Sequence, residues 1–90
     1  MNPVRELRHA LGLSVAKFAS ALGVGIQAVY SAESGVSVDL TPGMRSGLLS
    51  IGFDPDVLSE KYRAYREAMA CENKAKVIAA VAGLDVSDAV

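Results

Sequence analysis

The chain has little of several residue types that would indicate particular functions. It has one cysteine among 90 residues, which excludes an internal disulfide and a cysteine-based zinc site. Tryptophan is absent and 6% of the residues are aromatic, so there is little surface on which single-stranded bases can stack. No apolar run approaches the ~18–20 residues of a membrane-spanning helix, and the first residues lack the basic-then-apolar pattern of a secretion signal. We therefore expect a cytoplasmic protein that does not contact a membrane.

The sequence also lacks the groups of side chains that catalysis or metal binding requires. His9 is the one histidine, and no second metal ligand accompanies it. No pair of carboxylates falls in an apolar segment that would form a pocket. We expect His9 at the surface and Cys71 as a small buried residue. The sequence thus predicts no enzyme, no cofactor and no metal site.

Neither sign of charge is in large excess, since the formal net charge is −1 at pH 7. Residues 1–50 hold four Lys or Arg and three Asp or Glu, whereas residues 51–90 hold five and seven. We therefore expect an anionic partner to meet the N-terminal half. The overall composition, 51% apolar and 21% charged residues, is typical of a compact folded domain.

Residues that begin and end helices recur along the chain and predict an all-α fold. Asn, Ser, Thr and Asp stand where a helix N-terminus needs a side-chain acceptor, and proline follows three of them. Glycine follows the apolar-periodic runs, where it can adopt the left-handed conformation that ends a helix. The five expected helices begin after Asn2, after Ser14, at Val24 or Gly25, after Thr41 and after Asp54, and the first four end at Gly12, Gly23, Gly35 and Gly52.

The C-terminal part is expected to be divided. The fifth helix should run through "DVLSEKYRAYREAMA" to about residue 70. Asn73 is expected to cap a separate, short alanine-rich helix that ends at Gly83, and residues 84–90 are expected to form a frayed tail. The sequence therefore predicts a compact five-helix domain over residues 1–70 and a C-terminal helical extension or tail over residues 71–90.

The segment Leu13–Gly35 contains two short apolar-periodic runs with "LGVG" between them. Two short helices joined by a tight turn at a steep angle form a helix-turn-helix. Ala19 supplies the small side chain that is needed where the two helix axes cross. Gly23 can take positive φ at the first turn residue without a steric cost. The residues expected to be buried are Phe18, Ala19, Leu22, Val24, Val29 and Ala32.

The run Leu7–Gly35, "LRHALGLSVAKFASALGVGIQAVYSAESG", resembles the Cro/cI-type (XRE) phage-repressor family of helix-turn-helix proteins. It is similar to that family's pattern "LR…GLS…FA…LGV…(V/I)…E.G", and the five-helix interpretation of Pro3 to about Ala70 fits the family's domain. The resemblance implies a lambda-repressor-like fold that binds double-stranded DNA.

The resemblance also implies roles for individual residues. The second helix of the pair, Ile26–Ser34, corresponds to the recognition helix, which lies in the major groove. Gln27 is the best candidate base reader, because a carboxamide can bond to N6 and N7 of adenine. Arg8 and Glu33 match a structural arginine–glutamate pair. The residues implied to meet DNA are Gly25, Ile26, Gln27, Ala28, Tyr30 and Ser31, with Lys17 and Arg45 as nearby cations.

This chain departs from the family's pattern in three respects. Val15 stands where the family favours a glutamine that helps to hold phosphate, and Gly25 stands where it usually has a serine or threonine cap. The segment Ile26–Ser34 has no lysine or arginine, although phosphate contacts supply most non-specific affinity. We therefore expect a monomer to bind DNA weakly, with affinity recovered by dimerisation or by a partner protein.

Apolar residues in the C-terminal part are candidates for contact with a second copy. Four of them recur at helical spacing between residues 58 and 69 and suit either the domain core or a seam for a second chain. The later run "KVIAAVAGL" is too apolar for a solvated tail. The candidate dimer interface is Leu58, Tyr62, Tyr65, Met69, Val77, Ile78 and Val81.

Together these features predict a sequence-specific DNA-binding transcriptional regulator. It is expected to be a small phage or mobile-element repressor that acts as a homodimer on a palindromic operator. Two alternatives remain. One is a protein-interaction module that keeps the helix-turn-helix core, and the other is an antitoxin that binds DNA through one part and a toxin through its C-terminal helices.

Overall fold

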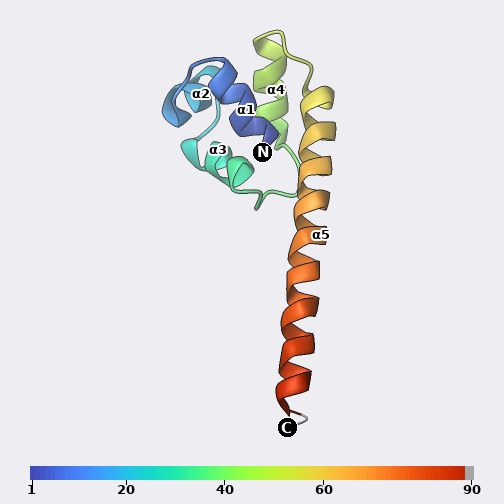
Figure 1. Ribbon diagram of the computed structural model, residues 1–90. Coiled ribbons are helices and arrows are strands. Elements are labelled where there is room, and N and C mark those ends of the chain that lie inside the picture. Colours follow the sequence, from blue (N-terminus) through green and yellow to red (C-terminus); the bar gives the residue numbers. More distant parts are fainter. Residues whose placement is uncertain (89–90) are drawn as a thin grey trace.

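The sequence folds into α-helices, as its capping pattern predicts. The computed structural model describes the backbone of residues 1–88 and the side chains of residues 1–84, and residues 1–88 contain five helices and no strand. The first four helices form a bundle, the first part of the fifth packs along one side of it, and the remainder of the fifth extends away (Figure 1). The helices are α1 (Pro3–Ala10), α2 (Val15–Leu22), α3 (Ile26–Glu33), α4 (Pro42–Ser50) and α5 (Pro55–Asp88).

Side-chain caps begin the short helices where the sequence predicts them. Asn2, Ser14 and Thr41 each accept hydrogen bonds from backbone N–H groups of the turn that follows. These bonds satisfy donors that the first turn of a helix leaves unpaired. Pro3 and Pro42 occupy the start of their helices, where the missing N–H group of proline costs no hydrogen bond.

The core forms where the inward faces of the five helices meet. Five of the six residues predicted to be buried are buried, and Val24 is half-buried instead. Val24 lies in the turn after α2, where its side chain packs beside Gly43 at the edge of the core. The core residues are Val4, Phe18, Ala19, Leu22, Val29, Ala32, Leu40, Met44, Leu48, Leu58 and Tyr62.

Leu58 and Tyr62 belong to this core, so their assignment to a dimer interface is wrong. α5 packs on α1 and α4, and this contact leaves Leu58 2% exposed and Tyr62 fully buried. The Tyr62 hydroxyl donates a hydrogen bond to the Ser37 carbonyl at 2.8 Å. Burial raises the pKa of Tyr62 above its ordinary value, so the hydroxyl keeps its proton at neutral pH. Tyr65 is half-buried and Met69 is exposed.

α5 is one continuous helix, so the separate helix expected after Asn73 and the frayed tail expected over residues 84–88 are wrong. Asn73 and Gly83 lie inside α5. The alanine, lysine and glutamate residues around them favour a helix strongly enough to outweigh two weak helix formers. Lys76 Nζ also lies 3.5 Å from Glu72 Oε1, an i,i+4 pair that supports the helix. Residues 89–90 of the expected tail lie outside the described residues.

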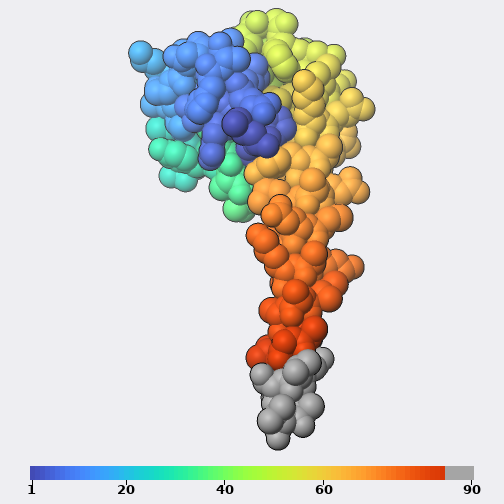
Figure 2. Space-filling view, viewed as in Figure 1, coloured from blue at the N-terminus to red at the C-terminus, as the bar shows by residue number. Residues whose placement is uncertain are grey.

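The part of α5 over residues 70–88, here called the stalk, extends away from residues 1–66, here called the body, and its first turn lies beside them (Figure 1). Figure 2 shows the stalk, as far as residue 84, as a narrow projection from the rounded body, and the extents of the structure are 60 × 22 × 21 Å. Cys71 is exposed on the stalk instead of buried as expected, because no other helix covers this part of α5 within the described residues. His9 is exposed, as predicted. Among the described residues, no single helix has both the length and the apolar composition to cross a membrane. α2 and α3 reach that length and composition only when they are counted together as one bent pair.

Candidate nucleic-acid interface

Helices α2 and α3 form a bent pair joined by the turn Gly23–Gly25. The chain direction changes by 114° between them, within the range of about 90–120° that is typical of a helix-turn-helix. Gly23 has φ 69° and ψ 30°, the left-handed conformation that glycine adopts without a steric cost. The Val24 N–H then donates to the Ala19 carbonyl at 3.0 Å and closes the C-terminus of α2. The turn glycine therefore has the role that the sequence predicts for it.

α3 presents one side to the core and the other to solvent. Val29 and Ala32 are buried. On the other side, Ile26 is 39% exposed and Tyr30 is 51% exposed, and Gln27 is exposed next to them. Among the residues implied to meet DNA, Gly25, Ile26, Gln27 and Tyr30 are thus exposed, whereas Ala28 and Ser31 are half-buried.

The N-terminal end of α3 is open at the body surface. Gly25 occupies the N-cap position, and no side chain accepts a hydrogen bond from the first turn. Nothing lies within 4 Å of the position that a Cβ atom on Gly25 would take. Unpaired N–H groups and the helix dipole at such an end attract anions. The start of α3 therefore combines exposed amide donors with two exposed side chains, Ile26 and Gln27.

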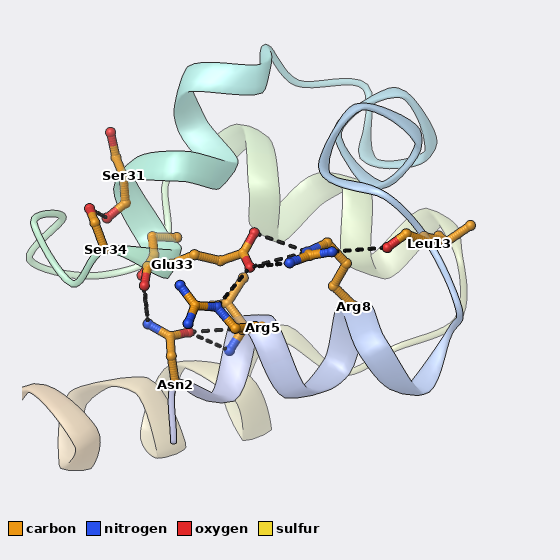
Figure 3. Close-up of polar contacts among 9 residues, drawn as sticks. Asn2, Arg5, Arg8, Leu13, Ser31, Glu33 and Ser34 are labelled. Atoms are coloured by element: carbon orange, nitrogen blue, oxygen red, sulfur yellow. Dashed lines mark hydrogen bonds and ion pairs between the residues drawn. The ribbon is translucent and has the colours of Figure 1, made fainter.

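A buried ion pair ties the C-terminal end of α3 to α1 (Figure 3). Glu33 is 6% exposed, and its Oε1 atom lies 2.8 Å from Arg8 Nη2. Arg8 Nε also donates to both carboxylate oxygens at 3.1 Å, and Arg8 Nη1 donates to the Leu13 carbonyl at 3.1 Å. Arg5 adds a longer contact, with 3.4 Å between its Nε atom and Glu33 Oε1. The predicted Arg8–Glu33 pair is confirmed, and it holds α3 against both α1 and the connection to α2.

Asn2 connects the same two helices through hydrogen bonds that the sequence does not indicate. Its Oδ1 atom caps α1 by accepting from the N–H groups of Val4 at 2.9 Å and Arg5 at 3.2 Å. Its Nδ2 atom donates to the carbonyls of Ala32 at 2.9 Å and Glu33 at 3.1 Å. One buried amide thus satisfies backbone groups at the start of α1 and at the end of α3. A capping pattern is local, so it predicts the first pair of bonds and carries no information about the second.

We expect Asn2→Ala to lower the free energy of unfolding by about 2 kcal/mol, because it removes a cap and takes a donor from two carbonyls. The Ala32 carbonyl keeps its bond from the Gly35 N–H, whereas the Glu33 carbonyl loses its donor. Asn2→Asp is the matched variant. Aspartate caps a helix as well as asparagine does, but it cannot donate to the carbonyls of Ala32 and Glu33. Chemical denaturation of both variants measures the two roles, and an Asn2→Asp protein as stable as wild type would contradict the role of the bonds to α3.

The cations near α3 differ in part from those expected. Lys17 is exposed on α2, as an interface residue should be. Arg45 is directed to α5 instead, so its assignment to the interface is corrected. Its guanidinium donates to Ser59 Oγ at 2.7 Å and forms an ion pair with Asp56 at the start of α5. α4 packs on both α2 and α5, and residue 45 falls on the side of α4 that faces α5.

A crevice of about 420 Å³ between α1 and α3 places further basic side chains beside the exposed side of α3. Tyr30 and Ser34 line it from α3, and Arg5, Arg8 and His9 line it from α1. The Arg5 side chain is 49% exposed, and the two arginines face one buried glutamate, so the crevice keeps positive charge. The signal in the sequence is that residues 5, 8 and 9 share one side of a helix. Only the packing of α1 on α3 places that side beside Tyr30.

Comparison with known proteins identifies no relative of this chain. No protein-family model matches the chain, and neither curated proteins nor solved structures give a significant match. The residues and geometry described above are therefore the basis of the proposals that follow.

Proposed function

We propose that this protein is a sequence-specific DNA-binding transcriptional regulator of the Cro/cI type. The observation that carries the proposal is the 114° bend between α2 and α3, which leaves one side of α3 and its N-terminal end exposed. In a helix-turn-helix protein, the second helix enters the major groove with its N-terminal residues against base edges. The exposure of this side of α3 supports the proposed contact.

The proposed contacts divide between base edges and phosphates. Gln27 pairs with an adenine through its carboxamide, and Ile26 contacts a thymine methyl group. The amides at the start of α3, together with Lys17 and Arg5, contact phosphates. The phosphate contacts set the position of α3 in the groove, and the base contacts select the sequence.

The proposed mechanism is occupancy of an operator in the cytoplasm by a homodimer. Two recognition helices enter successive major grooves of a palindromic site, about 34 Å apart, and exclude polymerase or a competing regulator. A second copy is needed because α3 carries no lysine or arginine, and few phosphate contacts give low affinity at physiological salt. Small repressors of phages and mobile elements act in this way.

We expect Gln27→Ala to lower affinity for the preferred duplex by about 1–3 kcal/mol and to relax the preference at one position of each half-site. The exposed side chain makes little difference to folding, so the thermal midpoint should not change. Lys17→Ala is the control for a phosphate contact. It should weaken binding to all duplexes similarly and lower the salt slope by about one. Uniform weakening by Gln27→Ala would make Gln27 a backbone contact instead.

Selection of bound sequences from a random duplex pool tests the proposal as a whole. A palindromic consensus with two half-sites is the expected result, and recovery of no consensus would refute sequence-specific binding. The same experiment gives the spacing of the half-sites, which reports how the two copies are arranged.

The second candidate function is a protein-interaction module. It is favoured by one observation, that the exposed side of α3 carries Ile26 and Tyr30 and no basic residue. The salt dependence of duplex binding separates the two functions, because phosphate contacts release counter-ions and a protein contact does not. An antitoxin would combine both properties, with DNA on α3 and a toxin on α5, and a toxin gene beside this one is the observation that would favour it.

A further inference from the structure

The stalk exposes its large apolar side chains on one side. At about 100° per residue, they lie within about a third of the helix circumference, and the alanines and the glycine of the same turns lie mostly on the other side. A helix that is apolar on one side is typical of a helix that packs on a partner. The large residues are Val77, Ile78, Val81 and Leu84, each between 48% and 63% exposed.

The same side of α5 continues up to the body as a line of residues that we call the seam. Its positions alternate in steps of four and three residues, the spacing of helices that pair in a coiled coil. The seam is rotated by about a third of a turn from Leu58 and Tyr62, which face the core, so a partner on the seam would not compete with the core. The seam residues are Arg63, Glu67, Ala70, Lys74, Val77, Val81 and Leu84.

The upper end of the seam forms one wall of a crevice of about 340 Å³ in the body. Glu67 and Ala70 line the crevice from α5, and the exposed Val38 lines it from the loop before α4. Arg66 Nε donates to the Gly35 carbonyl at 3.0 Å and holds this loop against the helix. The crevice and the apolar side of the stalk are therefore one continuous surface, of a length that one partner helix can cover.

The charges of the seam restrict the orientation in which a second copy can pair with it. In a parallel, in-register pair, Arg63, Glu67 and Lys74 would each lie opposite the same residue of the other copy, and like charges in that position repel. In the antiparallel orientation every seam residue meets a different residue. We propose that α5 pairs antiparallel with the α5 of a second copy, about a two-fold axis between residues 75 and 76.

This register places no two like charges opposite each other. The apolar stems of lysine and glutamate cover the apolar residue that they face, while their charged ends reach solvent. Leu84 enters the crevice beside Val38 of the other copy, so two exposed apolar groups are covered together. Arg63 comes to the level of position 88, which is an aspartate in the sequence. The opposed pairs are Ala70 with Val81, Lys74 with Val77 and Glu67 with Leu84.

The pairing also sets how far apart the two copies of the C-terminal end of α3 lie along the α5 axis. The bond from Arg66 holds Gly35, which follows α3, at the level of residue 66. In the proposed register, residue 66 of one copy and residue 66 of the other lie 19 residues apart, which is about 28 Å along the helix axis. That separation is similar to the spacing of about 34 Å between successive major grooves. This consequence rests on the proposed function, whereas the pairing itself does not.

Disulfide formation between single-cysteine variants tests the orientation. Cys71→Ser removes the native thiol. One variant then receives Ala70→Cys, and the other receives Val81→Cys together with a tag, so that the two chains differ in length. In a mixture of the two under oxidising conditions, we expect the disulfide between positions 70 and 81 as the main product. The two copies of position 70 are about 16 Å apart in the proposed pair, beyond the ~7 Å between Cα atoms that a disulfide tolerates. Disulfides of each variant with itself as the main products would overturn the antiparallel orientation.

Sedimentation equilibrium without DNA tests the seam. Wild type is expected to be a dimer. Val77→Lys is expected to raise the dissociation constant roughly 10-fold or more, because it removes an apolar residue and places a lysine opposite Lys74 of the other copy. Ala79→Lys, on the opposite side of the same turn, should leave the constant unchanged. Circular dichroism of both variants checks that the body stays folded. A monomeric wild type, or equal effects of the two variants, would overturn the proposal. Duplex binding is measured separately, so its failure cannot be confused with failure of the pairing.

Discussion

Replacement of Glu33 by alanine is expected to lower the free energy of unfolding by about 3 kcal/mol or more. Glu33 is 6% exposed, and the Arg8 side chain that it pairs with is 14% exposed. Loss of one partner of a buried pair leaves the other charge without compensation, and this cost exceeds the net contribution of the intact pair. Arg8 would keep its bond to the Leu13 carbonyl, but that single neutral acceptor cannot replace a carboxylate. Urea or guanidinium denaturation measures the loss.

Arg5→Ala is the matched control for this prediction. Arg5 contacts the same carboxylate from the same helix, but its side chain is 49% exposed and its Nε atom lies 3.4 Å from Glu33 Oε1. Exposed ion pairs contribute about 0–1 kcal/mol because solvent screens them, so we expect Arg5→Ala to cost less than about 1 kcal/mol. Similar losses for Arg5→Ala and Glu33→Ala would show that the depth of the pair does not determine its importance.

The residues that sequence patterns predict well are those whose role is local or belongs to a recurrent motif. Gly23 at the turn and the caps Ser14 and Thr41 act within one helix or one turn, so their neighbours in the sequence carry the necessary information. The Arg8–Glu33 pair joins two helices, and it could be predicted because it accompanies the helix-turn-helix pattern as a whole.

The residues that the sequence predicts poorly depend on packing between helices. Asn2 bonds to the end of α3, and Arg45 faces α5 instead of the proposed interface. The residues next to Asn2 and Arg45 in the sequence form no pattern that predicts either contact. Asn73 and Gly83 failed as boundaries of a separate helix for a different reason. A cap residue or a glycine interrupts a helix only where the surrounding residues do not favour its continuation, and here they do.

Sequence patterns also do not predict the close approach of α4 to α2. A glycine inside a helix usually indicates weakness, because it costs up to about 1 kcal/mol relative to alanine. In α4, Gly47 is buried where the helix meets the end of α2. A Cβ atom at this position would lie 2.2 Å from the Leu22 carbonyl oxygen and 2.7 Å from the Leu22 Cα atom. The absence of a side chain is therefore what lets the two helices meet.

We expect Gly47→Ala to destabilise the protein by about 3 kcal/mol, at the upper end of the usual cost of overpacking, although alanine is the better helix former. The atoms in the way belong to the backbone of α2, which cannot rotate aside as a side chain can, so α2 as a whole must shift against α4. Gly43→Ala in the same helix is the control, because its Cβ would lie 3.3 Å from Val24 Cγ1, a methyl group that can move. It should change stability by less than about 1 kcal/mol.

Thermal unfolding measures both variants, and a loss of 3 kcal/mol corresponds to a drop in midpoint on the order of 15 °C in a domain of this size. A Gly47→Ala protein with the midpoint of Gly43→Ala would mean that α2 and α4 are further apart than described. The same shift of α2 would displace the turn that positions α3, so Gly47→Ala should also weaken duplex binding at a temperature where the variant is still folded.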